Sequence, residues 1–243
     1  MANNFYVTNS SVVFVYNRAF DIRKRIFEFE KSLDIFFKVP FNMYPVPEEA
    51  DGNIPRFEAE SISGHSRLQV SQFRLTFATN YSKNFSTKLE SIREYISKRV
   101  LKLKNLVSSE NIQFVAYILQ LKFIMEKDEI NDYLKNNTGI KALSDKTVDF
   151  SLLYSFPLKS KYYLNVKSSK YIEEMLSIDP EKRIATKTGE KQCGIGVTLD
   201  MNTKYYNQQG KDFKFGLIDE IEKDIFQIIQ INKLQNYLTG ELV

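Results

Sequence analysis

Apolar residues follow the same order of patterns in both halves of this 243-residue chain. Each half opens with a run of β-branched and aromatic residues and a helix-spaced stripe. Three short alternating segments and a second helix-spaced stripe follow. Alternation with a period of two is typical of strands, and spacings of three and four residues are typical of a helix face. The sequence therefore predicts an α+β fold of two β-α-β-β-β-α units, with mainly antiparallel sheet packed against long helices.

The first unit is predicted over residues 1–106. Ser11–Tyr16 is expected to be a strand, and three more strands are expected at Arg56–Ser61, Ser66–Val70 and Phe73–Thr79. Apolar positions change from even to odd numbers between the last two segments, which one continuous strand cannot do, so a turn or bulge is expected between them. The two helix stripes of this unit are Ile22, Ile26, Phe29, Leu33 and Phe36, then Leu89, Ile92, Ile96, Val100 and Leu103.

The second unit is predicted over residues 107–243. Both faces of its first segment, Asn111–Met125, are apolar, which favours a central strand. A short helix is expected at Asp128–Asn136. The remaining strands and the final helix are expected at Asp149–Phe156, Tyr162–Lys167, Cys193–Asn202 and Phe213–Leu238. The two halves match in pattern rather than in residue identity, so they are interpreted either as an internal duplication or as one α+β sheet whose elements happen to fall in this order. In both cases one compact unit is expected.

An additional segment, residues 168–192, interrupts the order of the second unit. The spacing of its apolar residues Tyr171, Ile172, Met175 and Leu176 indicates at least one helical turn. An exposed loop is expected around Lys187–Glu190, which is polar and contains a glycine.

The cysteine content and the net charge indicate the cellular compartment and the kind of partner to expect. Cys193 is the one cysteine, so no internal disulfide can form, and this is typical of a reducing compartment. The N-terminus lacks the basic and apolar regions of a signal peptide, and no apolar run reaches the length of a membrane span, so we expect a cytoplasmic protein that does not enter a membrane. The net charge of +4 is small for a non-specific DNA-binding protein.

Motifs for nucleophilic or nucleotide chemistry are missing from the sequence. The one histidine, His65, is expected at a hairpin tip, and it is 128 positions from Cys193, which is unlike the close spacing of a zinc site. No glycine pattern of a phosphate-binding loop is present. Gly194 and Gly196 fall within a strand, where glycine permits a bulge or a close approach of another backbone. We therefore expect no cofactor.

Carboxylates leave one enzymatic alternative open. Glu58 and Glu60 are expected on one face of a strand, and Asp149 and Asp200 each on another strand. Oxygen ligands of this kind can hold Mg²⁺, so a carboxylate-dependent nuclease is a third hypothesis. The chain lacks the Glu-x-Lys pattern of restriction-type nucleases, and the simpler interpretation is that Glu58 and Glu60 form the solvated face of an edge strand.

A basic and aromatic segment is the strongest candidate for a binding surface. No acidic residue occurs between Ser151 and Ile172. Alternation places Lys161, Tyr163, Asn165 and Lys167 on one strand face, opposite apolar positions. Lysines that neutralise phosphates and aromatic rings that stack on bases are typical of nucleic-acid surfaces, whereas lysines on an exposed strand also prevent edge-to-edge aggregation. The candidate binding residues are Lys159, Lys161, Tyr163, Asn165, Lys167 and Lys170.

The apolar stripe of the final helix is wide. Its members are Ile218, Ile221, Ile225, Ile228 and Ile229, with Phe226 and Leu234 beside them. A stripe of this width indicates either deep burial in the chain's own core or packing on a second copy of the chain, which would make a homodimer.

Four stretches carry a resemblance to a known family: Val12–Tyr16, Ser66–Leu75, Leu119–Phe123 and Tyr237–Leu242. With them the chain resembles a sporadically distributed bacterial family of about this length whose function is uncharacterised. The chain departs from that family in lacking an Arg-Gly-rich central strand and a histidine in the last helix. The resemblance implies a fold and carries over no catalytic residue. Members of that family occur in scattered bacteria, as mobile or antiviral defence genes do, so the resemblance favours a role in defence.

These observations favour a non-enzymatic binding or assembly protein that recognises a macromolecular partner, such as a chaperone-like, toxin-neutralising or phage-defence complex subunit. A protein partner is expected. The alternative is a nucleic-acid-binding protein that uses the basic aromatic strand face.

Overall fold

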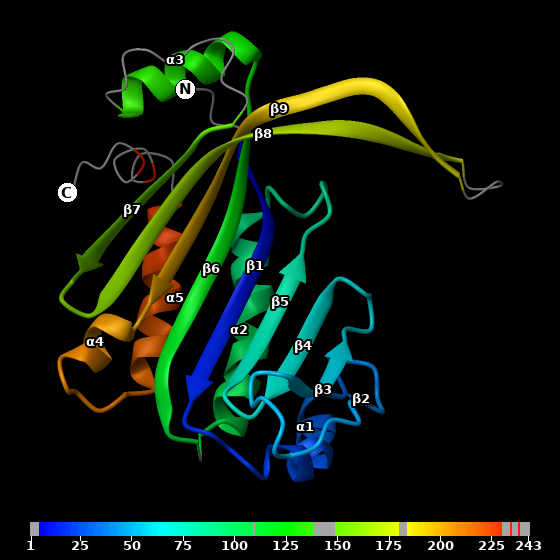
Figure 1. Cartoon of the computed structure of the whole chain (residues 1–243), viewed down its shortest axis with the longest axis vertical. Coiled ribbons are helices and arrows are strands. Elements are labelled where there is room, and N and C mark those ends of the chain that lie inside the picture. The colour runs from blue at the N-terminus through cyan, green and yellow to red at the C-terminus, as the bar shows by residue number, and fades with distance from the viewer. Residues whose placement is uncertain are drawn as a thin grey trace.

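The computed structural model describes residues 5–108, 110–138, 149–179, 184–229, 234 and 238. Within them the strands form one nine-stranded sheet in the order β2-β3-β4-β5-β1-β6-β9-β8-β7 (Figure 1), and every neighbouring pair is antiparallel. The strands are β1 (Phe5–Tyr16), β2 (Asn42–Met43), β3 (Pro55–Glu60), β4 (Ser66–Ser71), β5 (Arg74–Asn80), β6 (Ile112–Ile124), β7 (Ser151–Leu158), β8 (Tyr162–Asp179) and β9 (Ile184–Asn202).

The helices are a 3₁₀ turn η1 (Ile22–Arg25), α1 (Ile26–Leu33), α2 (Leu89–Leu106), α3 (Lys127–Thr138), α4 (Lys204–Gln208) and α5 (Gly216–Ile228). The α+β class with mainly antiparallel sheet is confirmed, and the long strand β6 is central as predicted. The predicted break in strand parity is also found, because β4 ends at Ser71 and β5 begins at Arg74. No helix among the described residues combines the length and the apolar character that a membrane crossing requires.

The two halves of the sheet have the same pairing order. In the first half β1 pairs with β5, followed outward by β4 and β3; in the second half β6 pairs with β9, followed outward by β8 and β7. The strands β1 and β6 pair with each other and join the two halves in the middle of the sheet. This order fits an internal duplication, which stays a prediction, as does the domain boundary at residue 106.

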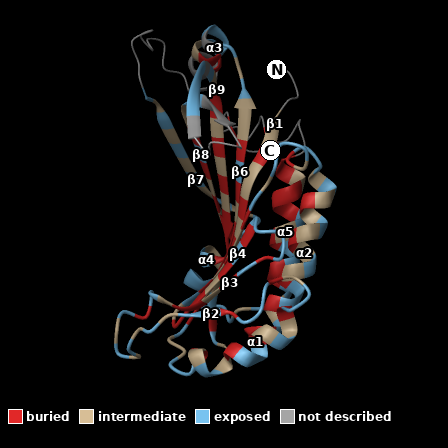
Figure 2. Ribbon diagram, turned by 90° about the vertical axis from the view of Figure 1, so that its right-hand side faces the viewer, coloured by how far each residue is buried: buried red, intermediate tan, exposed pale blue. Residues whose placement is uncertain are grey.

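The hydrophobic core lies between one face of the sheet and the helices α1, α2 and α5 (Figure 2). The strands direct alternate apolar residues towards these helices, and the positions between them point to the opposite face. On β1, for example, Val12 and Phe14 are fully buried, whereas Val13 and Val15 are partly exposed. Within the described part of the chain, α1, α2 and α5 therefore cover one face of the sheet and not the other.

The prediction of a helical turn and a loop within residues 168–192 is wrong. Residues up to Asp179 continue β8, and β9 starts at Ile184, so the segment is a two-stranded ribbon that runs sideways beyond the end of the sheet (Figure 1). The pairing that begins at Tyr163 and Asn202 continues without a break as far as Glu174 and Lys191. Extending an existing ladder satisfies each new backbone group, and this outweighs the helical spacing of a few apolar side chains.

The final helix begins later than predicted. Residues 211–214 are not helical and α5 starts at Gly216. The rings of Phe213 and Phe215 pack edge to face on each other with their centroids 5.5 Å apart, and both rings contact the core. Beyond Ile229, only Leu234 and Leu238 belong to the described residues, and both are buried. The rest of the motif at Tyr237–Leu242 lies outside the described part of the chain.

The apolar stripe of α5 faces the chain's own core. Ile218, Ile221, Ile225 and Ile229 are completely buried within this one chain, so deep burial is the interpretation that holds for the described part of the helix. A homodimer through the C-terminal helix stays a prediction.

Candidate functional site

The candidate site is the sheet face that α1, α2 and α5 do not cover, here called the open face. It is defined by fifteen residues that form three rows across β5, β1, β6, β9 and β8. The rows are Thr76, Val13, Ala116, Asn202 and Tyr163; Ala78, Ser11, Ile118, Asp200 and Asn165; and Asn80, Asn9, Gln120, Thr198 and Lys167. Figure 1 views the sheet from this side, with α2 and α5 behind it.

The middle of the open face is apolar and nearly uncharged. Val13, Ala116 and Ile118 lie next to one another on β1 and β6, and each is buried or only partly exposed. Of the fifteen residues, only Asp200 and Lys167 carry a charge. A depletion of charge at the centre with polar groups around it is typical of a protein interface.

Asp200 sits in a group of amide side chains beside this apolar centre. Asn165 Nδ2 donates to Asp200 Oδ2 at 3.1 Å, and Asn202 Nδ2 donates to Asp200 Oδ1 at 3.1 Å. The two amides hold the carboxylate in place without neutralising its charge. A positively charged or amide group of a partner that lies on this face would therefore meet an oriented acceptor.

The short helix α4 forms one border of the open face. The hydroxyl of Tyr163 donates to Gln208 Oε1 at 2.7 Å, and its ring packs edge to face on Tyr205 at 5.2 Å. Lys204 lies over the ring of Phe114 at 4.6 Å from its centroid. These contacts fix Tyr163 against α4, so its ring is less free to stack on a base than the sequence alone indicates.

The six predicted binding residues do not all lie on one surface of the structure. Tyr163, Asn165 and Lys167 share the open face as predicted. Lys170 lies opposite the buried Ile195 in the ladder, which places it on the other side of the strand. The last two residues, Lys159 and Lys161, belong to the turn between β7 and β8.

Both of these turn lysines are paired with acidic residues of α5. Lys159 Nζ lies 2.6 Å from Asp224 Oδ1, and Lys161 Nζ lies 2.6 Å from Glu220 Oε2. These ion pairs reduce the positive charge that the turn could offer to phosphates. The sequence pattern missed them because α5 is about sixty residues further along the chain.

The ion pair between Lys161 and Glu220 is expected to lower the pKa of the Glu220 carboxyl and so to affect the stability of the fold at acid pH. The hydrogen bond from Lys161 holds the pKa of the Glu220 carboxyl below its ordinary value, and burial opposes this while Tyr162 adds to it. Because the folded-state pKa is lowered, the pair stabilises the fold above the ordinary glutamate pKa of about 4.5, and this contribution is lost as the pH falls through the lower pKa. Lys161→Met is expected to raise the pKa of Glu220, as measured by carboxyl NMR titration. Lys167→Met is the matched control and should leave that pKa unchanged; equal shifts in both variants would contradict the assignment.

The predicted carboxylate ligands have other partners, although Glu58 and Glu60 share one face of β3 as predicted. Glu58 accepts hydrogen bonds from Arg67 and Gln69, and Glu60 pairs with Lys38 at 2.9 Å. Asp200 is held by its two asparagines. Among the described residues, no group of three or more His, Cys, Asp or Glu side chains is arranged to hold a metal ion. The nuclease hypothesis therefore has no supporting geometry in this part of the chain.

A scan against protein-family models and a search of curated proteins found no match to this chain. The resemblance to a sporadically distributed bacterial family therefore stays a prediction.

Proposed function

We propose that this chain is a non-catalytic binding and assembly protein that holds a protein partner against the open face of its sheet. One observation carries the proposal: the apolar patch of Val13, Ala116 and Ile118 lies at the centre of a sheet face that α1, α2 and α5 do not cover. Antiparallel sheets commonly expose one face to water, but that face is then usually polar. An apolar, charge-poor centre is better explained by a surface that a partner covers.

The surroundings of the patch suggest how a partner is oriented. Asp200 and Lys167 are on neighbouring strands at one side of the patch, and uncharged polar residues of β5 and β1 are at the other. Burial of the patch supplies affinity, and the polar groups select partners that satisfy them. A cytoplasmic chaperone-like, toxin-neutralising or defence-complex subunit would use such a surface.

The proposal predicts that a charge at the centre of the open face abolishes partner binding. Ile118→Glu is expected to lower the amount of a stoichiometric protein partner, co-purified from native cells, by at least tenfold, because the carboxylate would be buried without a counter-charge. Leu101→Glu is the matched control, since Leu101 is a 58% exposed leucine on the helical side. Equal recovery of the partner with both variants, each folded by circular dichroism, would overturn the proposal.

The nucleic-acid alternative keeps Tyr163, Asn165 and Lys167, which do share the open face. It predicts retention on single-stranded RNA or DNA at low salt, with an affinity that falls steeply as salt rises. Lys167→Glu should then weaken retention, whereas Lys161→Glu should have a smaller effect because Lys161 is already paired with Glu220. No retention of the wild-type protein at low salt would exclude this alternative.

A further inference from the structure

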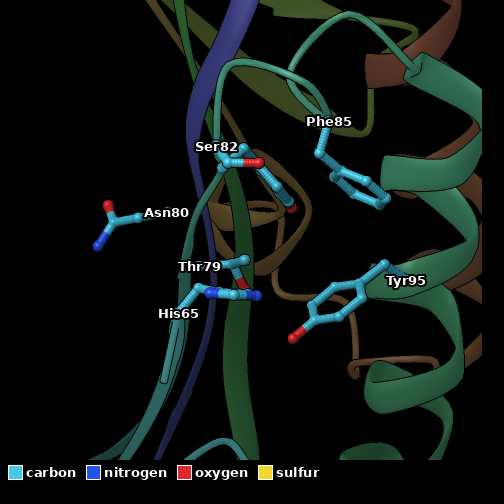
Figure 3. Close-up of a pocket in the computed structure, with 7 residues that line it drawn as sticks. His65, Thr79, Asn80, Ser82, Phe85 and Tyr95 are labelled. Carbon is cyan, nitrogen blue, oxygen red and sulfur yellow. The ribbon is translucent and has the colours of Figure 1, made fainter. Parts of the chain in front are cut away.

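A small cavity lies on the opposite side of the sheet from the open face, between the ends of β4 and β5 and the helix α2. Its volume is about 150 Å³. Figure 3 shows His65, Thr79, Ser82, Phe85 and Tyr95 around it, whereas Asn80 points away to the other side of the strand. The lining includes Asn80 from the edge of the open face but none of Val13, Ala116 and Ile118, so the cavity does not depend on the apolar patch of the proposed function.

Aromatic rings form the walls of this cavity. The rings of Tyr81 and Phe85 stack with their centroids 5.8 Å apart, and Phe85 packs edge to face on Tyr95 at 6.3 Å. Contacts among the three rings hold them in place, so the space between them is preformed. Offset and edge-to-face contacts with such walls favour a flat aromatic ligand over a saturated one of similar size.

Polar groups are placed along one side of the same space. The hydroxyl of Tyr95 lies 2.6 Å from Ser66 Oγ, which lies 2.9 Å from Thr79 Oγ1, so the three hydroxyls form a chain. The imidazole of His65 and the hydroxyl of Tyr95 are directed towards the same space (Figure 3). No side chain of the described residues hydrogen-bonds the imidazole, which leaves its nitrogens open to a ligand.

A positive charge lies behind the wall. The guanidinium of Arg99 is 3.4 Å from the centroid of the Tyr95 ring and 4.4 Å from that of Phe36. Among the described residues, no carboxylate lies within 4 Å of it, and its Nε is buried without a hydrogen-bond partner. The resulting field opposes a cationic ligand and favours a neutral or anionic one.

We propose that this cavity binds a single six-membered aromatic ring that carries a hydroxyl or similar hydrogen-bonding substituent. A cavity of about 150 Å³ with apolar walls holds a ring of the size of benzene. The rings of Tyr81, Phe85 and Tyr95 contact the faces and edges of the ligand. The hydroxyl of Tyr95 and the imidazole of His65 bind its substituent. A free phenol and a tyrosine side chain of a peptide share this chemistry.

The single histidine provides a specific test, because the imidazole C–H signals in the NMR spectrum come from His65 alone. Titration with phenol is expected to shift these signals in a saturable way in the millimolar range, and cyclohexanol is expected to shift them at least tenfold more weakly. Ser82→Phe fills the cavity and should abolish the phenol shift. Asn84→Phe, an exposed position in the same turn that does not line the cavity, should leave it intact.

Two further measurements test the contribution of the Tyr95 hydroxyl and show whether the bound aromatic ring comes from a small molecule or from a peptide. Tyr95→Phe removes one hydroxyl and should weaken phenol binding about threefold to tenfold while toluene binding is unchanged. A short blocked peptide with a central tyrosine is titrated in parallel. Binding of phenol alone assigns the cavity to small molecules, and equal or tighter binding of the peptide assigns it to a partner's tyrosine. No saturable shift with either probe, or an equal phenol shift in Ser82→Phe, would overturn the proposal.

Discussion

Replacement of Gly194 by alanine is expected to lower the free energy of unfolding by about 3 kcal/mol or more, because the new methyl group has no space. A Cβ atom at this position would lie 1.9 Å from the carbonyl oxygen of Phe123 and 2.9 Å from its carbonyl carbon. Both atoms belong to the backbone of β6, which cannot move aside without disturbing the central ladder. The residue lies opposite Ile124, at the point where β6 ends and the β8–β9 ribbon continues beyond the sheet.

Gly196 offers a matched control two residues further along the same strand. A Cβ atom there would be no closer than 3.7 Å to any neighbouring atom, which is an ordinary contact distance. Gly196→Ala is therefore expected to change the free energy of unfolding by less than about 1 kcal/mol, since alanine also restricts the unfolded chain. Urea denaturation of the two variants measures both values. Similar stabilities of the two proteins would show that β6 does not approach Gly194 this closely.

Replacement of Arg56 by leucine is expected to cost about 3–4 kcal/mol of stability, because its guanidinium group is the centre of a buried hydrogen-bond network. The side chain is completely buried. Its two terminal nitrogens donate to the carbonyl oxygens of four residues in one loop, at distances from 2.8 to 3.5 Å: Glu48, Ala50, Asp51 and Ile54. The carboxylate of Glu48 lies 3.6 Å from Arg56 Nε and balances the charge. Leucine would remove these four hydrogen bonds and the contact with the Glu48 carboxylate. That carboxylate would keep Arg23 and Gln72 as partners, so the cost arises mainly from the lost hydrogen bonds.

The control for this prediction is Arg74→Leu, because Arg74 is an exposed arginine on β5, which is separated from the strand of Arg56 by β4. Its loss of stability should stay within about 0.5 kcal/mol. Arg56→Lys keeps the charge but has no planar fork to reach several carbonyls at once, so its stability should be close to that of Arg56→Leu. Urea denaturation gives the stabilities, and limited proteolysis should show faster cleavage within residues 44–55 in both Arg56 variants. Full stability of Arg56→Lys would contradict the network.

The sequence determined the parts of this fold that depend on local periodicity. Alternating apolar residues located β3, β4, β5 and the core of β8, because a period of two buries one face of a strand wherever the strand lies. The helix spacing of Ile92, Ile96 and Val100 located α2 for the same reason. The apolar character of both faces also identified β6 as central. Gly194 was expected to permit a close approach, and the carbonyl of Phe123 is the group that approaches it.

Only the tertiary structure decided which distant groups meet. From the sequence, Lys159 and Lys161 were predicted to offer positive charge to a partner. In the folded chain, α5 brings Asp224 and Glu220 beside them, and both lysines form ion pairs. Arg56 was predicted as a strand residue and is one, but only the folded loop of residues 48–54 supplies the carbonyl oxygens that surround its guanidinium group. The segment within residues 168–192 had the spacing of a helix, but pairing between its own two arms made it a ribbon. The open face and the aromatic cavity likewise depend on the order of the strands and on the side of the sheet that the helices cover. No local sequence pattern contains that information, because contacts between distant segments form only when the chain is folded.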